Sequence, residues 1–238
     1  MLENPNPQMP SKAIPDRAQN PFIATDSVIF HALKGKLYIP LLQLKHPPYQ
    51  GMWKLIGGLI SLDQSIESSV IQQIENKTNI QKQNFIIDQV YTFGEVNRDI
   101  EKHSISIVYL ALTHQMWPLK NSQHDMTVKW FPITELPPLA YDHEKIIKFT
   151  IGRLQAKVRS SNIIQGLLPE EFTLTELQQV YETVLDKTID KRNFRKKISS
   201  MNIVESLKKK KTGMQNRPAE LYRFISKQIE TIELFSRQ

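Results

Sequence analysis

One stretch, residues 57–80, constrains the fold more than any other part of the chain. It opens with the pair Gly57-Gly58. The segment that follows carries apolar residues at every fourth position, Ile66, Val70 and Ile74. This spacing places three apolar side chains on one face of a helix. Asn79 stands where that helix would end, and after Gly it is the usual residue for a left-handed C-terminal cap. We expect a double-glycine loop followed by an amphipathic helix.

The same stretch resembles the Nudix box, whose pattern is G-x5-E-x7-R-E-U-x-E-E-x-G-U, with U an apolar residue. Laid from Gly58, the apolar positions match at Ile74 and Ile80. The chemical positions of the pattern (Glu, Arg, three more Glu and Gly) hold other residues here, namely Gln64, Gln72, Gln73, Asn76, Lys77 and Asn79. The sequence keeps the scaffold of the box and lacks its metal-binding residues.

The loss of metal binding follows from helix geometry. Positions 73, 76 and 77 share one helical face, where three carboxylates would bind a hard cation such as magnesium. Here this face carries two neutral amides and the ammonium of Lys77, which would repel a metal ion. Glu75 lies about 200° around the helix from Gln73, and Glu67 lies nearly two turns earlier. We therefore expect no metal, no cofactor and no catalytic residue, so the chain should not be an enzyme.

Composition restricts the class of protein further. The 238 residues suffice for one or two domains, and the absence of Cys favours an intracellular, cytoplasmic protein without disulfides. No apolar run approaches the roughly 20 residues of a membrane span, and no secretory signal is visible. Residues 1–21 contain five Pro and few apolar residues, so we expect a disordered N-terminal arm.

Charge divides the chain into two parts. Residues 1–150 contain 14 Lys and Arg against 14 Asp and Glu, whereas residues 151–238 contain 17 against 10. The whole formal excess of +7 thus lies in the last third. This asymmetry indicates two modules with different partners, the second of them binding a polyanion.

The first module shows several runs of strand length. They cover residues 27–32, 37–44, 85–93, 104–112 and 128–132. Pro40 interrupts the second run and predicts an edge position or a bulge there. Asp142 is expected to cap a long helix, whose apolar residues are Ile146, Ile147, Ile151, Leu154 and Val158. Strands with helices on both sides predict an α/β sandwich.

The second module begins with a strong helix start. Thr173 and Glu176 have the spacing of a capping box, and Phe172 and Leu177 that of a hydrophobic staple. After a short turn, Asp190 is expected to cap a second helix over residues 191–201. This helix is basic and has a polar N-terminal turn, as the recognition helix of a helix-turn-helix requires.

Two short strands should follow, at 203–205 and 221–224. The basic segment between them, which includes Lys208–Lys211, resembles a wing whose lysines neutralise phosphates. Residues 225–237 have the apolar spacing of a further amphipathic helix, for which we assign no role.

Several stretches together resemble one family, the Nudix-related transcriptional regulators (NrtR). They are TFGEVNRD, ISIVYLAL, KWFPITELPPLAYDH, LLPEEFTLTELQQVYETVLDKTIDKRNFRKKI and NRPAELYRF, within residues 22–224. The resemblance implies an α+β protein, a Nudix-like α/β/α sandwich followed by a winged helix-turn-helix. We place an effector-sensing domain at 22–157 and a DNA-binding domain at 158–238. Asn216 departs from the Gly that the family often shows before Arg217-Pro218.

The resemblance also implies a function. In this family a Nudix fold that does not hydrolyse its ligand acts as a sensor, and the winged helix binds operator DNA as a homodimer. The best-described members repress genes of NAD metabolism and respond to ADP-ribose, while other branches sense compounds such as pentoses. Two other interpretations stay open: an active Nudix hydrolase with non-standard metal ligands, and a regulator whose Nudix fold serves only for dimerisation.

Candidate site residues follow from these interpretations. Predicted ligand-binding residues are Lys45, Trp53, Gly57, Gly58, Arg98 and Asp99. Predicted contacts to double-stranded DNA are Lys191, Arg192, Asn193, Arg195, Lys196, Lys208, Lys209, Lys210, Lys211 and Arg217. Arg217 has an equal claim to a purely structural role at the end of the wing, and Trp53 is also a typical core residue. The six His residues show no metal-binding spacing.

Overall fold

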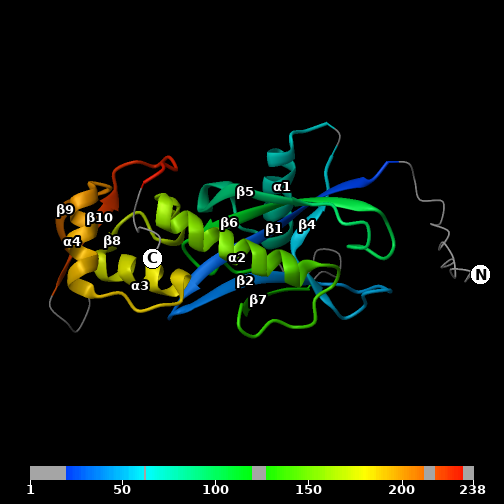
Figure 1. Cartoon of the computed structure of the whole chain (residues 1–238), viewed down its shortest axis with the longest axis horizontal. Coiled ribbons are helices and arrows are strands. Elements are labelled where there is room, and N and C mark those ends of the chain that lie inside the picture. Colours follow the sequence, from blue (N-terminus) through cyan, green and yellow to red (C-terminus); the bar gives the residue numbers. More distant parts are fainter. Residues whose placement is uncertain (1–19, 62, 120–126, 212–217, 233–238) are drawn as a thin grey trace, which may run out of the picture.

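The computed structural model describes residues 20–61, 63–119, 127–211 and 218–232, which form a sheet-and-helix sandwich followed by a smaller winged helix (Figure 1). A seven-stranded sheet comprises β1 (Phe22–Leu33), β2 (Lys36–Gln43), β3 (Trp53–Lys54), β4 (Ile56–Leu59), β5 (Phe85–Phe93), β6 (Ser104–Thr113) and β7 (Thr127–Pro132). Its order is β3-β2-β1-β6-β5, with β4 paired to β1 and β7 to β2. The central pair β1 and β6 is parallel, and the other pairs are antiparallel.

Helices α1 (Ile66–Thr78) and α2 (His143–Ser160) cover opposite faces of this sheet. Successive side chains of β1 point to opposite faces of the sheet: Val28 and Phe30 pack with α2, and Ile29 packs with α1. Two apolar layers therefore enclose the sheet, which confirms the expected α/β/α sandwich.

The box helix begins and ends where the sequence predicts. Ser65 caps α1 by accepting a hydrogen bond from the amide of Ser68 at 3.1 Å. Asn79 ends the helix in the left-handed conformation with φ 68°. Val70 and Ile74 are fully buried and Ile66 is half-buried against the same cluster, so the expected apolar stripe is confirmed.

The second module has the expected winged-helix elements. A short strand β8 (Phe172–Thr173) leads into α3 (Leu174–Leu185), and α4 (Lys191–Met201) follows. Both halves of the Thr173–Glu176 capping box form, and Asp190 caps α4 through the amide of Asn193 at 2.8 Å. The strands β9 (Val204–Lys211) and β10 (Ala219–Phe224) form an antiparallel wing, with β8 on the other side of β10.

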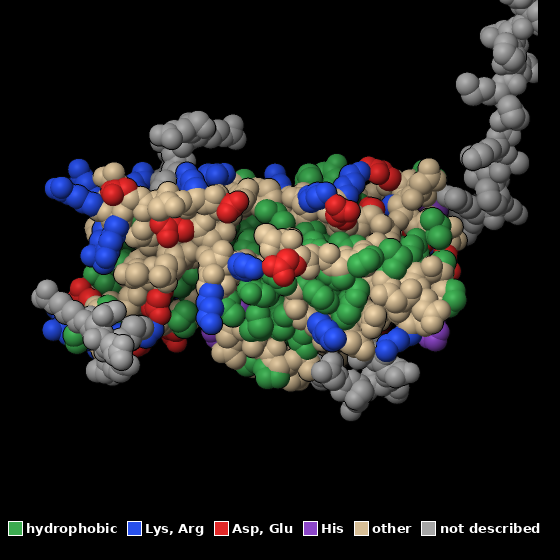
Figure 2. Space-filling model, turned by 90° about the horizontal axis from the view of Figure 1, so that it is seen from below, with side chains coloured by type: hydrophobic (Ala, Val, Ile, Leu, Met, Phe, Trp, Pro, Cys, Tyr) green, Lys and Arg blue, Asp and Glu red, His purple; other side chains and the backbone are tan. Residues whose placement is uncertain are grey.

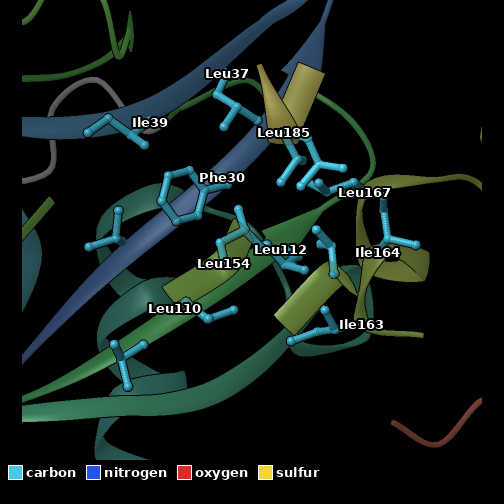
Figure 3. Packing of buried hydrophobic residues seen from close by; sticks show 14 of the residues in the cluster. Phe30, Leu37, Ile39, Leu110, Leu112, Leu154, Ile163, Ile164, Leu167 and Leu185 are labelled. Atoms are coloured by element: carbon cyan, nitrogen blue, oxygen red, sulfur yellow. The ribbon is translucent and has the colours of Figure 1, made fainter. Parts of the chain in front are cut away.

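The two modules share one apolar core. Leu154 of α2 and Leu185 of α3 belong to the cluster that covers one face of the large sheet. Two short 3-10 segments are also present, Lys82–Asn84 and Ile163–Leu167, and the second joins the modules. Figure 3 shows Ile163, Ile164 and Leu167 from this second segment beside Leu112 of β6. Gln155 of α2 also donates to the carbonyl of Val184 at 3.1 Å. The junction is therefore packed and hydrogen-bonded.

The structure corrects four details. Strand β1 begins at Phe22 rather than Ser27, because residues 22–30 pair along β6. Asp142 precedes α2, but its carboxylate makes no cap bond and binds Arg98 instead. Strand β9 continues to Lys211, so the wing lysines lie on a strand instead of a loop.

The fourth correction concerns the expected C-terminal helix. Residues 225–232 form no helix and run back to the end of α2, where the amide of Ile232 donates to the carbonyl of Ser160 at 2.8 Å. Residues 233–237 of that prediction, Arg217, and residues 1–19 of the expected arm lie outside the described residues. Within the described part of the chain, no helix is both long and apolar enough to cross a membrane.

Candidate ligand cleft and nucleic-acid interface

The box face of α1 lies against the double glycine of β4. Lys77 reaches across from the last turn of the helix and donates a hydrogen bond to the carbonyl of Gly57. One turn earlier, Gln73 donates to the carbonyls of Gly58 at 3.3 Å and Leu59 at 3.1 Å. Amide and ammonium groups thus stand at this loop where the Nudix pattern has carboxylates, and they hold the loop through its backbone oxygens.

The ammonium of Lys77 sits in an unfavourable environment for a cation. Burial, together with repulsion from Lys54, lowers the pKa of Lys77 to about 8, although attraction to Asp26 partly offsets this. Among the described residues no carboxylate lies within ion-pair distance of its Nζ atom. Lys77 is therefore a partly desolvated cation without a salt bridge.

A buried ionic network lies behind the double glycine. The guanidinium of Arg98 donates to Asp142 at 2.9 and 3.3 Å and lies 3.5 Å from Asp26. His143 lies 3.5 Å from Asp26 through Nε2, and its Nδ1 accepts the amide of Leu55 at 3.0 Å. These bonds tie the strand β1 and the loop that carries Arg98 to the first turn of α2.

The charge of Asp26 is stabilised within this network. Burial alone raises the pKa of Asp26, but His143, the hydroxyl of Ser106 at 2.6 Å and Arg98 together outweigh it. The pKa of Asp26 therefore lies below its usual value, and the carboxylate is ionised at neutral pH.

Gly57 allows β4 to pass directly over Asp26. A Cβ atom at this position would lie 2.1 Å from the carbonyl oxygen of Thr25 and 2.6 Å from Oδ1 of Asp26. Since real Cβ atoms do not approach backbone oxygen so closely, only Gly fits here. The first Gly of the pair is therefore required for β4 to pack against β1.

The six predicted ligand residues occupy very different environments. Lys45 is exposed on the loop after β2, and Asp99 is half-buried and accepts the amide of Glu101 at 2.9 Å. Arg98 is 8% exposed and engaged in the ionic network, and Trp53 is 8% exposed and packs edge-on against Phe131. Arg98 and Trp53 thus have structural contacts, while Gly57 and Gly58 lie against the side chain of Lys77.

Two other pairs of residues at this end of the sheet lie outside the predicted site. Asp26 and His143 belong to the ionic network around Arg98, although neither is among the predicted site residues. Tyr49 and Tyr141 contact each other in a tilted arrangement, with ring centroids 4.4 Å apart, beside the loop that carries Arg98. Tyr141 has a φ of 57°, and burial raises its pKa to about 12. A charged residue just before an apolar run was the only available signal for Asp26.

No group of three or more His, Asp or Glu side chains able to hold a metal ion occurs among the described residues. Two hollows, of about 810 and 730 Å³, lie at the junction between the modules rather than at the double glycine. Most of their ionisable lining residues are already paired with each other or with neighbours, such as Arg223 with Glu205. The candidate ligand site therefore remains the double glycine with Gln73 and Lys77, where Oε1 of Gln73 is buried without a hydrogen-bond partner among the described residues.

The first turns of α4 present a cluster of basic residues to solvent. Phe194 and Ile198 are buried against α3, which leaves the opposite face exposed. That face carries Lys191, Arg192, Asn193, Arg195 and Lys196. In the part of the chain that the structure describes, none of these cations forms a salt bridge. Figure 2 shows Lys and Arg side chains gathered at this end of the molecule, whereas hydrophobic surface is more extensive over the sandwich.

The lysines of the wing lie in two different environments. Lys208, Lys209 and Lys210 are exposed, and Lys208 has a φ of 54° at an irregularity in the β9–β10 pairing. Lys211 is half-buried and pairs with Glu176 of the capping box at 2.5 Å. Lys211 therefore fixes the wing to α3, and its charge is already neutralised.

A Nudix-type sandwich with an altered box, joined to a basic winged helix, defines the class of this protein. A family profile for the NUDIX domain matches residues 23–150, and one for the NrtR DNA-binding winged helix domain matches residues 164–224. Over 209 residues the chain is 31% identical to the ADPR responsive transcriptional repressor NtrR of Acinetobacter baylyi, covering 86% of this chain and 82% of that protein.

A solved structure agrees with this relative. Shewanella oneidensis NrtR complexed with a 27mer DNA is 32% identical, with a TM-score of 0.73 over 85% of this chain and 93% of that chain. The chain belongs to the NrtR family. It also shares 32% identity over 129 residues with the ADP-ribose pyrophosphatase of Methanocaldococcus jannaschii, covering 54% of this chain and 72% of that enzyme.

Proposed function

We propose that this protein is a DNA-binding transcriptional repressor whose Nudix domain senses ADP-ribose or a related nucleotide or pentose. The observation that carries the proposal is the exposed basic face of α4, whose cations form no salt bridge with any described residue, beside a basic wing strand. Cations without partners at the start of a recognition helix suit phosphate and base contacts in the major groove. The DNA complex of Shewanella oneidensis NrtR and the ADPR-responsive repressor of Acinetobacter baylyi support the same function here.

DNA binding is tested with the protein and a DNA fragment from upstream of its own gene. We expect Arg192→Ala and Arg195→Ala each to abolish specific binding and to leave ligand binding intact. Lys129→Ala, at an exposed cation on β7, is the matched control and should bind as the wild type does. Wild-type affinity should fall with salt by about 0.9 log units per log unit of salt for each phosphate contacted. The proposal fails if the folded wild type gives no specific footprint at physiological salt.

We further propose that the protein does not hydrolyse its ligand. Hydrolysis in a Nudix site needs carboxylates that hold a metal ion, and the corresponding face here carries Gln73, Asn76 and Lys77. The alternative is an active hydrolase with non-standard metal ligands, which the similarity to an ADP-ribose pyrophosphatase favours. Magnesium-dependent release of AMP from ADP-ribose at a rate that scales with enzyme concentration would establish that alternative.

The organisation that we propose has a sensing domain at 22–157 and a DNA-binding domain at 158–238, connected through α2. We also propose a homodimer that acts on palindromic DNA in the cytoplasm and regulates NAD-metabolism genes. The edge strand β5 supports a contact between two copies, because Tyr91 is 54% exposed and stacks with the partly exposed Phe149 of α2. Light scattering on purified protein, compared with the Tyr91→Arg variant, tests this assembly: a dimeric wild type and a monomeric variant are expected.

A further inference from the structure

Two polar side chains of α1 converge on the double glycine. A Cβ atom built on Gly58 would lie 3.3 Å from Nζ of Lys77 and 3.2 Å from Oε1 of Gln73. Both groups therefore border the same small region in front of β4. Their positions are fixed by hydrogen bonds to backbone carbonyls, which Lys77 makes to Gly57 and Gln73 makes to Gly58 and Leu59.

Lys77 has unused capacity to bind an anion. An ammonium group has three N–H donors, and the only bond recorded among the described residues takes one of them. The nearby charges are Asp26 of β1, which attracts the ammonium, and Lys54 of β3, which repels it. Burial has already removed part of the hydration of the Lys77 ammonium. An anion that binds here therefore pairs with a cation whose desolvation cost is already partly met.

Gln73 offers the complementary group. Its Nε2 faces two carbonyl oxygens, so the orientation of the amide is determined. Its Oε1 is buried and has no donor among the described residues. A buried acceptor without a donor is costly, and a phosphate oxygen cannot satisfy it, whereas a sugar hydroxyl can.

We propose that Lys77 takes the place of the metal ion and binds the diphosphate of the ligand directly, while Oε1 of Gln73 accepts a hydrogen bond from an adjacent ribose hydroxyl. This inference rests on the proposed sensing function and names its chemistry. The ligand class is a nucleoside diphosphate sugar, bound in the absence of any divalent cation. A site built in this way holds the diphosphate without activating water against it.

The test is calorimetry with two probes, ADP-ribose and inorganic pyrophosphate, each with excess EDTA or with magnesium. We expect wild-type binding in EDTA that is at least as tight as in magnesium. Lys77→Met should weaken both probes at least 30-fold, and Lys77→Arg should retain affinity within about fivefold. Lys82→Met removes an exposed cation just beyond α1 and serves as the matched control. Thermal unfolding midpoints establish that each variant is folded.

The outcomes separate the two proposals. Unchanged affinity of folded Lys77→Met, or no binding of pyrophosphate by the wild type in EDTA, overturns the role of Lys77. Pyrophosphate binding that depends on Lys77, without binding of ADP-ribose, supports that role and refutes the proposed effector. Gln73→Leu should weaken ADP-ribose at least tenfold and leave pyrophosphate unchanged, because only ADP-ribose has a sugar hydroxyl. Equal losses for both probes would overturn the role of Gln73.

Discussion

Replacing Arg98 by Leu should destabilise the protein strongly, because Arg98 is the centre of a buried charge network. Its side chain is 5% exposed, and those of Asp26 and Asp142 are 10% and 12% exposed. Leu fills part of the same space but leaves two buried carboxylates without their cation. The hydroxyl of Ser104, which accepts from Arg98 at 2.9 Å, also loses its donor.

The size of the effect follows from burial. Removing one partner of a buried ion pair costs about 3–5 kcal/mol, because an uncompensated charge stays inside the protein. A typical exposed pair contributes only about 0–1 kcal/mol. Since domains are stable by about 5–15 kcal/mol, Arg98→Leu should remove a large share of the total free energy of unfolding.

Equilibrium unfolding in urea, followed by circular dichroism at pH 7, measures this free energy. We expect Arg98→Leu to lower the midpoint with little change in the slope. Lys36→Ala breaks the exposed pair between Lys36 and Glu135 and should leave the midpoint unchanged. A loss below about 1 kcal/mol for Arg98→Leu would refute the conclusion that the network stabilises the fold.

Three further predictions concern stability. The pKa of Asp26 in the folded protein lies below its usual value of 3.8. The ionised carboxylate therefore stabilises the fold above pH 3.8, and this stabilisation is lost as the pH falls through the folded pKa. In acid titrations, the free energy of unfolding should decline more steeply for the wild type than for Asp26→Asn. Gly57→Ala should cost about 1–3 kcal/mol in urea unfolding, because the added Cβ meets backbone oxygen and β4 must shift. Thr173→Ala removes half of the capping box and should cost about 1 kcal/mol, whereas Thr173→Ser should cost less in the same assay.

Local patterns in the sequence predicted most of the fold. The apolar spacing of α1, the left-handed Asn79 and the Thr173–Glu176 capping box depend on neighbouring residues, and all three are confirmed. The order of helices and strands in the winged helix was also predictable from local patterns. The element boundaries that were predicted wrongly depend on contacts with residues distant in the sequence. Strand β1 extends back to Phe22 because β6 pairs with it, and no local pattern encodes that partner.

The site was less predictable, because it is assembled from separate elements. The predicted absence of a metal-binding face rests on residues 73, 76 and 77 alone, which share one face of α1. The buried network joins Asp26, Arg98 and His143 across more than 100 residues of sequence, and no spacing rule connects them. Lys211 is a predicted DNA contact because it lies in the basic wing, whereas its position beside Glu176 gives it a structural partner.

The central claim is that a Nudix domain without hydrolytic chemistry controls a winged helix. One measurement tests it most directly: fluorescence anisotropy of the upstream DNA fragment titrated with protein, in EDTA, with and without ADP-ribose, followed by chromatography of the recovered nucleotide. We predict specific DNA binding whose affinity changes at least tenfold with ADP-ribose, while the ADP-ribose is recovered intact. DNA binding that is indifferent to ADP-ribose, or conversion of the ligand to AMP when magnesium replaces EDTA, would contradict the claim.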